Sequence, residues 1–188
     1  LKTIDIHANP YTSIELGTNF ETFGVALSDY TVASSLRVSA SGLKTLSVSA
    51  YGSNSFIPNL VGLDLAGCTD LETLKVSRIG IDRLDVSMLP RLKMLTVESC
   101  SNITALDLRN NPDLEQFSGA SCSSLKDLDI TANPKLRSLS VAYTAIESLD
   151  ISAYKSLNSL SISSMPKLRY LNMGDNPYIT SFNYDHIN

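Results

Sequence analysis

The sequence contains no tryptophan and has only two histidines and three cysteines in 188 residues. His7 and His186 lie near opposite ends of the chain, so in an extended fold they cannot share a metal ion or a catalytic triad. Cys68, Cys100 and Cys122 form no C-x-x-C pair, which argues against a zinc site, a redox dithiol and a disulfide scaffold. We therefore expect buried, free thiols and neither a metal nor another cofactor.

Charge is also scarce. Charged residues make up 18% of the chain and the net charge is −4, so the basic surface that binds nucleic acid or an anionic membrane is missing. No apolar run approaches the ~20 residues of a membrane helix, and no signal peptide is visible. Leu1 falls inside a motif, so we expect this sequence to be a segment of a longer chain. The glycine-loop, G-x-S-x-G and H-E-x-x-H motifs are absent, and no enzyme is predicted.

A short repeat is present instead. The motif apolar-x-x-apolar-x-apolar recurs twelve times, and successive copies start 10 or 11 residues apart. The copies are LVGLDL (60–65), LETLKV (71–76), IDRLDV (81–86), LKMLTV (92–97), ITALDL (103–108), LEQFSG (114–119), LKDLDI (125–130), LRSLSV (136–141), IESLDI (146–151), LNSLSI (157–162), LRYLNM (168–173) and ITSFNY (179–184). Such regularity is typical of a repeat protein.

Two kinds of copy alternate, so the true period is 21 or 22 residues. The residue between the last two apolar positions defines each kind. In the acidic kind it is Asp64, Asp85, Asp107, Asp129, Asp150 and then Asn172. In the other kind it is Lys75, Thr96, Ser118, Ser140, Ser161 and Asn183.

The first third is less regular. LKTIDI (1–6) matches the acidic kind, and loop-forming residues predict insertions at 17–33 and 49–59 that protrude from the same side. We expect little helix outside 17–33. The whole chain, 1–188, is predicted to form one domain of about eight coils, irregular over 1–59 and regular over 60–188.

The spacing predicts strands, because residues two apart, such as Leu63 and Leu65, point to the same side of a strand. Each strand is too short to be stable alone, so successive coils must stack and bury their leucines in columns, Leu128 among them. Asn-Pro pairs, as at Asn111-Pro112 and Asn133-Pro134, follow the acidic strands, where a buried Asn can bind the backbone of the adjacent coil.

This pattern resembles the bacterial leucine-rich-repeat family, L-x-x-L-x-L-x-x-[N/C/T]-x-L. It is most similar to repeat proteins that Bacteroidetes secrete or display. The resemblance implies a mainly β, right-handed solenoid of stacked parallel strands, an extracellular or cell-surface location, and binding of a protein or a glycan. Ile79, Leu89, Tyr154 and Met165 depart from the family, because they replace the usual Asn.

The acidic column allows two interpretations. Stacked carboxylates could bind calcium. Alternatively, each carboxylate could accept hydrogen bonds from nearby groups such as Ser87, Thr131 and Ser152, with Arg83 and Arg109 offsetting the charge. The second interpretation is favoured, because the glycine-rich nonapeptide of calcium-binding solenoids is missing.

The face of the second strand kind is the candidate ligand-binding surface, although its hydroxyl groups are equally typical of a plain solvated sheet. Its candidate residues are Lys75, Thr96, Glu98, Gln116, Ser118, Ser140, Ser161 and Asn183, with Tyr51 and Tyr143 at the edges. We expect a protein or glycan ligand, no nucleic acid, no membrane insertion, and a monomer or weak end-to-end association. The alternative function is a structural spacer, a stalk that holds another domain away from the cell surface.

Overall fold

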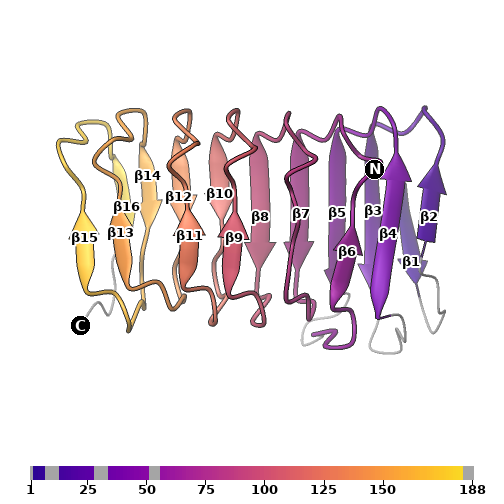
Figure 1. The fold of residues 1–188 in the computed structure, drawn as a ribbon, viewed down its shortest axis with the longest axis horizontal. Coiled ribbons are helices and arrows are strands. Elements are labelled where there is room, and N and C mark those ends of the chain that lie inside the picture. The colour runs from indigo at the N-terminus through magenta and orange to yellow at the C-terminus, as the bar shows by residue number, and fades with distance from the viewer. Residues whose placement is uncertain (1, 7–12, 28–33, 51–55, 184–188) are drawn as a thin grey trace.

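The computed structural model is a flattened coil with two walls of short strands, and it describes residues 2–6, 13–27, 34–50 and 56–183 (Figure 1). One wall is a continuous, all-parallel sheet of nine strands. In spatial order these strands are β1 (Lys2–Ile6), β3 (Thr22–Leu27), β5 (Thr45–Ala50), β7 (Thr73–Ser77), β8 (Met94–Glu98), β10 (Gln116–Ser118), β12 (Ser138–Ser140), β14 (Ser159–Ser161) and β16 (Ser181–Asn183).

The second wall lies opposite the nine-stranded sheet and is broken into three small parallel sheets. Its strands are β2 (Ser13–Leu16), β4 (Ser35–Ala40) and β6 (Gly62–Asp64), then β9 (Ala105–Asp107) and β11 (Asp127–Asp129), and finally β13 (Ser148–Asp150) and β15 (Tyr170–Asn172). The segment 81–86, a regular copy of the motif, forms no strand.

The coil is right-handed. In Figure 1 the second wall runs upward at the front, the nine-stranded sheet runs downward at the back, and the chain advances from right to left. The described residues contain no helix, and each wall gains one strand or strand-like segment per turn. The predicted mainly β solenoid is therefore confirmed, and the number of turns is close to the eight expected.

The core fills the space between the walls, because every second side chain of each strand points inward. The register of the nine-stranded sheet aligns one apolar residue from each strand between β3 and β14 into a column whose members are at most 1% exposed. The column consists of Phe23, Leu46, Leu74, Leu95, Phe117, Leu139 and Leu160. Burial of stacked aliphatic and aromatic side chains is the main driving force for coil stacking.

A polar ladder of three buried or partly buried asparagines (Asn111, Asn133 and Asn176) ties the second wall together, as predicted. The Asn133 amide donates to the carbonyls of Leu108 and Asn111, at 3.0 and 2.8 Å. The residues that replace Asn elsewhere are all buried: Leu89 and Tyr154 in the second wall, and Ile79 and Met165 after strands β7 and β14 of the nine-stranded sheet. Tyr154 also keeps a polar link, since its hydroxyl donates to the Ile130 carbonyl.

The first third differs from the prediction in two ways. The predicted insertion 17–33 contains β3, which pairs with β1 on one side and β5 on the other. LKTIDI (1–6) therefore belongs to the nine-stranded sheet and not to the acidic wall. Apolar and polar residues alternate in the strands of both walls, so the motif alone could not assign this strand to one of them.

Only part of the second predicted insertion is described. Ser49 and Ala50 are still in β5, while Ile57 is 2% exposed and forms a β-bridge with Ile79. Residues 28–33 and 51–55 lie outside the described residues, so the predicted protrusion stays a prediction.

Candidate binding surface

A column of mostly hydroxyl-bearing side chains runs along the outward face of the nine-stranded sheet. Strand register places the predicted residues next to one another in the order Lys75, Thr96, Ser118, Ser140, Ser161 and Asn183, with Ser47 before them. Lys75 is exposed, while the Thr and Ser residues are partly covered by their neighbours. Because the backbone holds this column at a spacing of about 4.8 Å, it presents a regular row of hydrogen-bonding groups.

Two further predicted residues lie beside this hydroxyl column. Gln116 aligns with Met94 and Ser138 in the neighbouring outward column and is exposed. Glu98 lies on the opposite side of the column, and its carboxylate accepts a hydrogen bond of 2.9 Å from the Ser118 hydroxyl. The sheet thus brings together the strand residues predicted for the binding surface.

Tyr143 lies just after β12 and is 56% exposed. Its φ of 59° is in the left-handed region, as are those of Arg78, Ser99, Ser121 and Ser164 at the corresponding position of other coils. This conformation costs a non-glycine residue about 1–2 kcal/mol. This left-handed turn recurs from coil to coil at the edge of the sheet, and in this coil it presents the exposed Tyr143 side chain. Tyr51 lies outside the described residues, as do both histidines.

The acidic column of the second wall binds its own backbone. Asp129 accepts hydrogen bonds from the Thr131 amide at 2.9 Å and the Thr131 hydroxyl at 2.6 Å, and Asp150 makes the same pair with Ser152. Each of these aspartates is the last residue of its strand, and the turn that it stabilises follows directly. Each remaining member of the column likewise accepts a hydrogen bond from the backbone amide two residues later. These members are Asp64, Asp85, Asp107 and Asn172.

These contacts confirm the interpretation based on local hydrogen bonds, with one correction. Arg109 pairs with Asp107, as expected, whereas Arg83 pairs with Asp82, 3.8 Å away, and not with the column. Within the described ranges no three His, Cys, Asp or Glu side chains are grouped to hold a metal ion.

The electrostatics of the second wall oppose acid catalysis. The Arg109 side chain and amide lower the pKa of Asp107 to about 2, and hydrogen bonds from Thr131 lower the pKa of Asp129. Both carboxylates line a depression of about 730 Å³ beside Leu128, which is only partly buried. A general acid needs a raised pKa, so these lowered values do not suit either carboxylate to that role.

Comparison with known proteins gives the fold a name. No family model and no curated protein matches the chain. The functional domain of InlJ from Listeria monocytogenes, which includes a cysteine ladder, matches with a TM-score of 0.55 and 21% identity over 88% of this chain. The fold is a leucine-rich-repeat solenoid. This chain spans 42% of the InlJ chain.

Two other structures match less well. The TLR13–ssRNA13 complex gives a TM-score of 0.45 at 16% identity, over 89% of this chain and 36% of TLR13. The internalin inlF from Listeria monocytogenes str. 4b F2365 gives 0.36 at 14% identity, over 95% of this chain and 87% of inlF. The described residues of the present solenoid include no helix that is long and apolar enough to cross a membrane.

The interior of the solenoid holds the three cysteines as free thiols, as predicted. Cys68 and Cys122 donate to the carbonyls of Val38 and Val97, at 3.2 and 3.1 Å. Burial raises the pKa of Cys100 to about 12 and that of Cys122 to about 11. Neither thiol therefore ionises near neutral pH, which fits a packing role and not a redox role.

One surface feature was missed in the sequence. Just before the nine-stranded sheet, each coil of the solenoid contributes a residue whose amide donates to the carbonyl of its counterpart in the previous coil. Their side chains alternate in sign from one coil to the next, so residues of like charge recur every second coil, and we call them the charge ladder. The recurrence is 43 residues from Glu72 to Glu115 and 44 from Lys93 to Arg137, and it is longer in the irregular first third. The charge ladder consists of Glu21, Lys44, Glu72, Lys93, Glu115 and Arg137.

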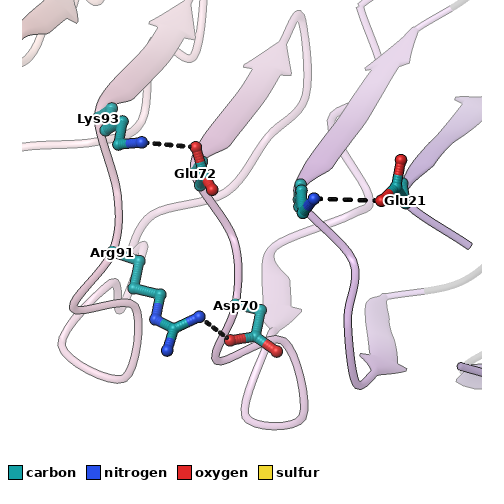
Figure 2. Close-up of polar contacts among 6 residues, drawn as sticks. Glu21, Asp70, Glu72, Arg91 and Lys93 are labelled. Carbon is teal, nitrogen blue, oxygen red and sulfur yellow. Dashed lines mark hydrogen bonds and ion pairs between the residues drawn. The ribbon is translucent and has the colours of Figure 1, made fainter.

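Ion pairs join the coils along the charge ladder (Figure 2). Lys44 pairs with Glu21 at 3.1 Å and Lys93 pairs with Glu72 at 2.7 Å. A second row lies two residues upstream, where Arg91 pairs with Asp70 at 2.7 Å. In the same row Lys135 pairs with Asp113 at 2.6 Å. Tabulating charges by repeat position would have revealed this alternation in the sequence.

Proposed function

We propose that this solenoid is a non-enzymatic binding module that recognises a protein or a glycan through the outward face of its nine-stranded sheet. The observation that carries the proposal is the hydroxyl column, which runs in register from Ser47 to Asn183 across seven strands. Such a row can donate to and accept from an extended ligand at regular intervals. Proteins and glycans both offer such arrays of polar groups.

The second wall supports the non-enzymatic part of the proposal. Its carboxylates are committed to local hydrogen bonds and have lowered pKa values, so they make poor general acids. The resemblance of the repeats to secreted and surface-displayed bacterial proteins supports an extracellular or cell-surface location. We propose in addition that residues 1–188 act as one domain.

The experiment is an array of glycans and extracellular proteins probed with the wild-type protein and two variants. The double variant Ser118→Arg and Ser140→Arg places two bulky cations in the hydroxyl column, whose register brings these residues together. The control, Ser148→Arg, places a cation at an exposed position of the second wall. We expect the double variant to lose ligands that the control retains. Equal binding by both variants would contradict the assignment of the face.

The structural spacer remains the second candidate, because the hydroxyl column contains no aromatic residue and Trp is absent from the chain. Protein interfaces usually rely on Trp, Tyr or Arg for affinity. A stalk would retain no ligand in the array, and the double variant would then behave like the wild type.

A further inference from the structure

We propose that the C-terminal end of the charge ladder is a binding site for a carboxylated sugar, such as a uronic acid unit of an acidic glycan. The site is a depression of about 480 Å³ at the edge of the nine-stranded sheet. It is lined by Arg137, Lys155, Ser156, Asn158, Tyr178 and Thr180. It is separate from the hydroxyl column, so the two proposals can fail independently.

Each coil edge in the middle of the molecule carries two residues of one sign, and the next edge carries two of the opposite sign. Thus Asp113 and Glu115 are followed one coil later by Lys135 and Arg137. The pattern predicts two acids on the coil after that, but Ser156 and Asn158 occupy those positions.

Two cations therefore end the alternation with an acidic neighbour on one side only. Arg137 has Glu115 4.0 Å away in the preceding coil, whereas the following position in its column is the neutral Asn158, whose amide donates to the Arg137 carbonyl. By contrast, Lys93 has Glu72 on one side and the charges of Glu115 and Asp113 on the other. A ligand carboxylate at this edge would complete the alternation.

The charge of the depression differs from that of four other depressions among the described residues. Its lining has two cationic side chains and no carboxylate. Those four depressions each include at least one aspartate. In a chain of net charge −4, this local excess of positive charge favours an anion.

The neutral residues at the site favour a sugar over other anions. Tyr178 is 63% exposed, the largest fraction among the exposed large apolar and aromatic side chains, and its ring can stack on the apolar face of a pyranose. Ser156, Asn158 and Thr180 add hydroxyl and amide groups that can bind sugar hydroxyls. The Lys155 ammonium donates a 3.0 Å hydrogen bond to the Asp175 carbonyl.

The test is calorimetric titration with tri-galacturonate, with an uncharged trisaccharide and with a short poly-glutamate peptide. We expect tri-galacturonate to bind and the uncharged sugar to bind at least ~10-fold more weakly. Added salt should lower the affinity for tri-galacturonate. Arg137→Gln and Tyr178→Ala should each weaken the binding of tri-galacturonate by about 10-fold. A charge-assisted contact or a stacked ring contributes about 1.4 kcal/mol or more, which corresponds to this factor.

Matched controls separate the site from general effects. Lys93→Gln removes the same charge in the middle of the charge ladder, and Tyr170→Ala removes a 52% exposed ring from the second wall. Both should bind like the wild type. If Arg137→Gln alters the melting curve, Lys155→Gln replaces it as the variant that removes a positive charge from the site.

The proposal would be overturned if tri-galacturonate did not bind at millimolar concentration, or if the uncharged sugar bound equally well. It would also be overturned if the peptide bound more tightly than tri-galacturonate, or if the site variants and the controls lost the same affinity. None of these results bears on the Ser118→Arg and Ser140→Arg experiment, which tests the sheet face.

Discussion

The two walls of the solenoid are built from the same six-residue motif, yet one is a continuous sheet of nine strands and the other is broken into three. The difference lies in the residue between the last two apolar positions. In the second wall an aspartate accepts the amide two residues later and ends the strand, as Asp129 does with Thr131. In the nine-stranded sheet a Ser, Thr or Lys faces outward and the chain goes on pairing with the next coil.

The walls also differ beyond the polar residue. In the nine-stranded wall the amide three residues after it still donates to the next coil, as the Ser121 amide does to the Ala142 carbonyl. Strand length does not distinguish the walls, because β10 and β12 of the continuous sheet are three residues long, as are β9 and β11 of the second wall. In the second wall, however, the segment containing Leu84 and Val86 pairs with neither neighbour. The continuous wall is therefore the one that carries long-range order along the solenoid. It is also the wall on which an extended ligand would find an unbroken surface.

The largest expected effect contrasts a leucine from each wall. Leu95→Ala, in the continuous sheet and fully buried, should destabilise the protein by about 2–5 kcal/mol because it leaves a cavity between two coils. Leu128→Ala, in β11, should cost less than half as much, since this side chain is partly exposed in a depression. Urea unfolding measures both, and equal losses would contradict the difference between the walls.

The next effect concerns the polar ladder that holds the broken wall. Asn133→Ala should cost about 1–3 kcal/mol, because it leaves the buried carbonyls of Leu108 and Asn111 without their amide donor. Asn133→Leu should cost less than Asn133→Ala, since Leu89 fills the equivalent position in another coil and is fully buried. Thermal unfolding would test this order, and a harmless Asn133→Ala would show that the ladder contributes nothing.

A third effect is a dependence on pH that belongs to the second wall. The pKa values of Asp85, Asp107, Asp129 and Asp150 are lowered by hydrogen bonds in the folded protein. A lowered folded pKa means that the stabilisation is present above the unfolded value, near 4, and is lost as the pH falls toward the folded value, which is about 2 for Asp107. Melting temperature should therefore fall in this range.

Replacing the carboxylates with amides isolates this cause. Asn172 already accepts the Gly174 amide at 3.2 Å, so Asp129→Asn and Asp150→Asn together should keep the turns while removing two titrating groups. We expect the double variant to lose less stability between pH 4 and pH 2 than the wild type. Parallel curves of melting temperature against pH would contradict this cause.

The smallest effects are expected at the surface of the continuous sheet. Lys93→Gln breaks the ion pair with Glu72, but both groups are solvated, so the melting temperature should fall only slightly and the difference should vanish in high salt. Ser140→Ala should barely change the melting temperature. A large loss for Lys93→Gln that persists in salt would mean that the charge ladder holds the coils together.

The sequence was sufficient to predict the fold over 60–188, because the period of the repeat dictates stacking and the period of two dictates which residues point inward. It also predicted that Lys75, Thr96, Ser118, Ser140 and Ser161 share one face. Their role in binding stays a prediction.

Three features could not be predicted in the same way. β3 was taken for part of an insertion, because Thr22–Leu27 lacks the leucine spacing of the other strands and only its pairing with β1 and β5 reveals it. The repeat pattern predicts that Leu128 is buried, but the side chain lines a depression in the second wall that the sequence does not reveal. The charge ladder was overlooked, because its alternation spans two coils and exceeds the repeat period.

Native-state hydrogen exchange tests the central claim, that one wall is a continuous cooperative sheet and the other is not. Amides of Leu95, Phe117 and Leu139 lie within strands of the nine-stranded sheet and should all exchange at the slow rate of global unfolding. Amides of Leu84 and Val86 lie outside any strand and should exchange much faster through local opening. Equal protection of the two groups would contradict the account.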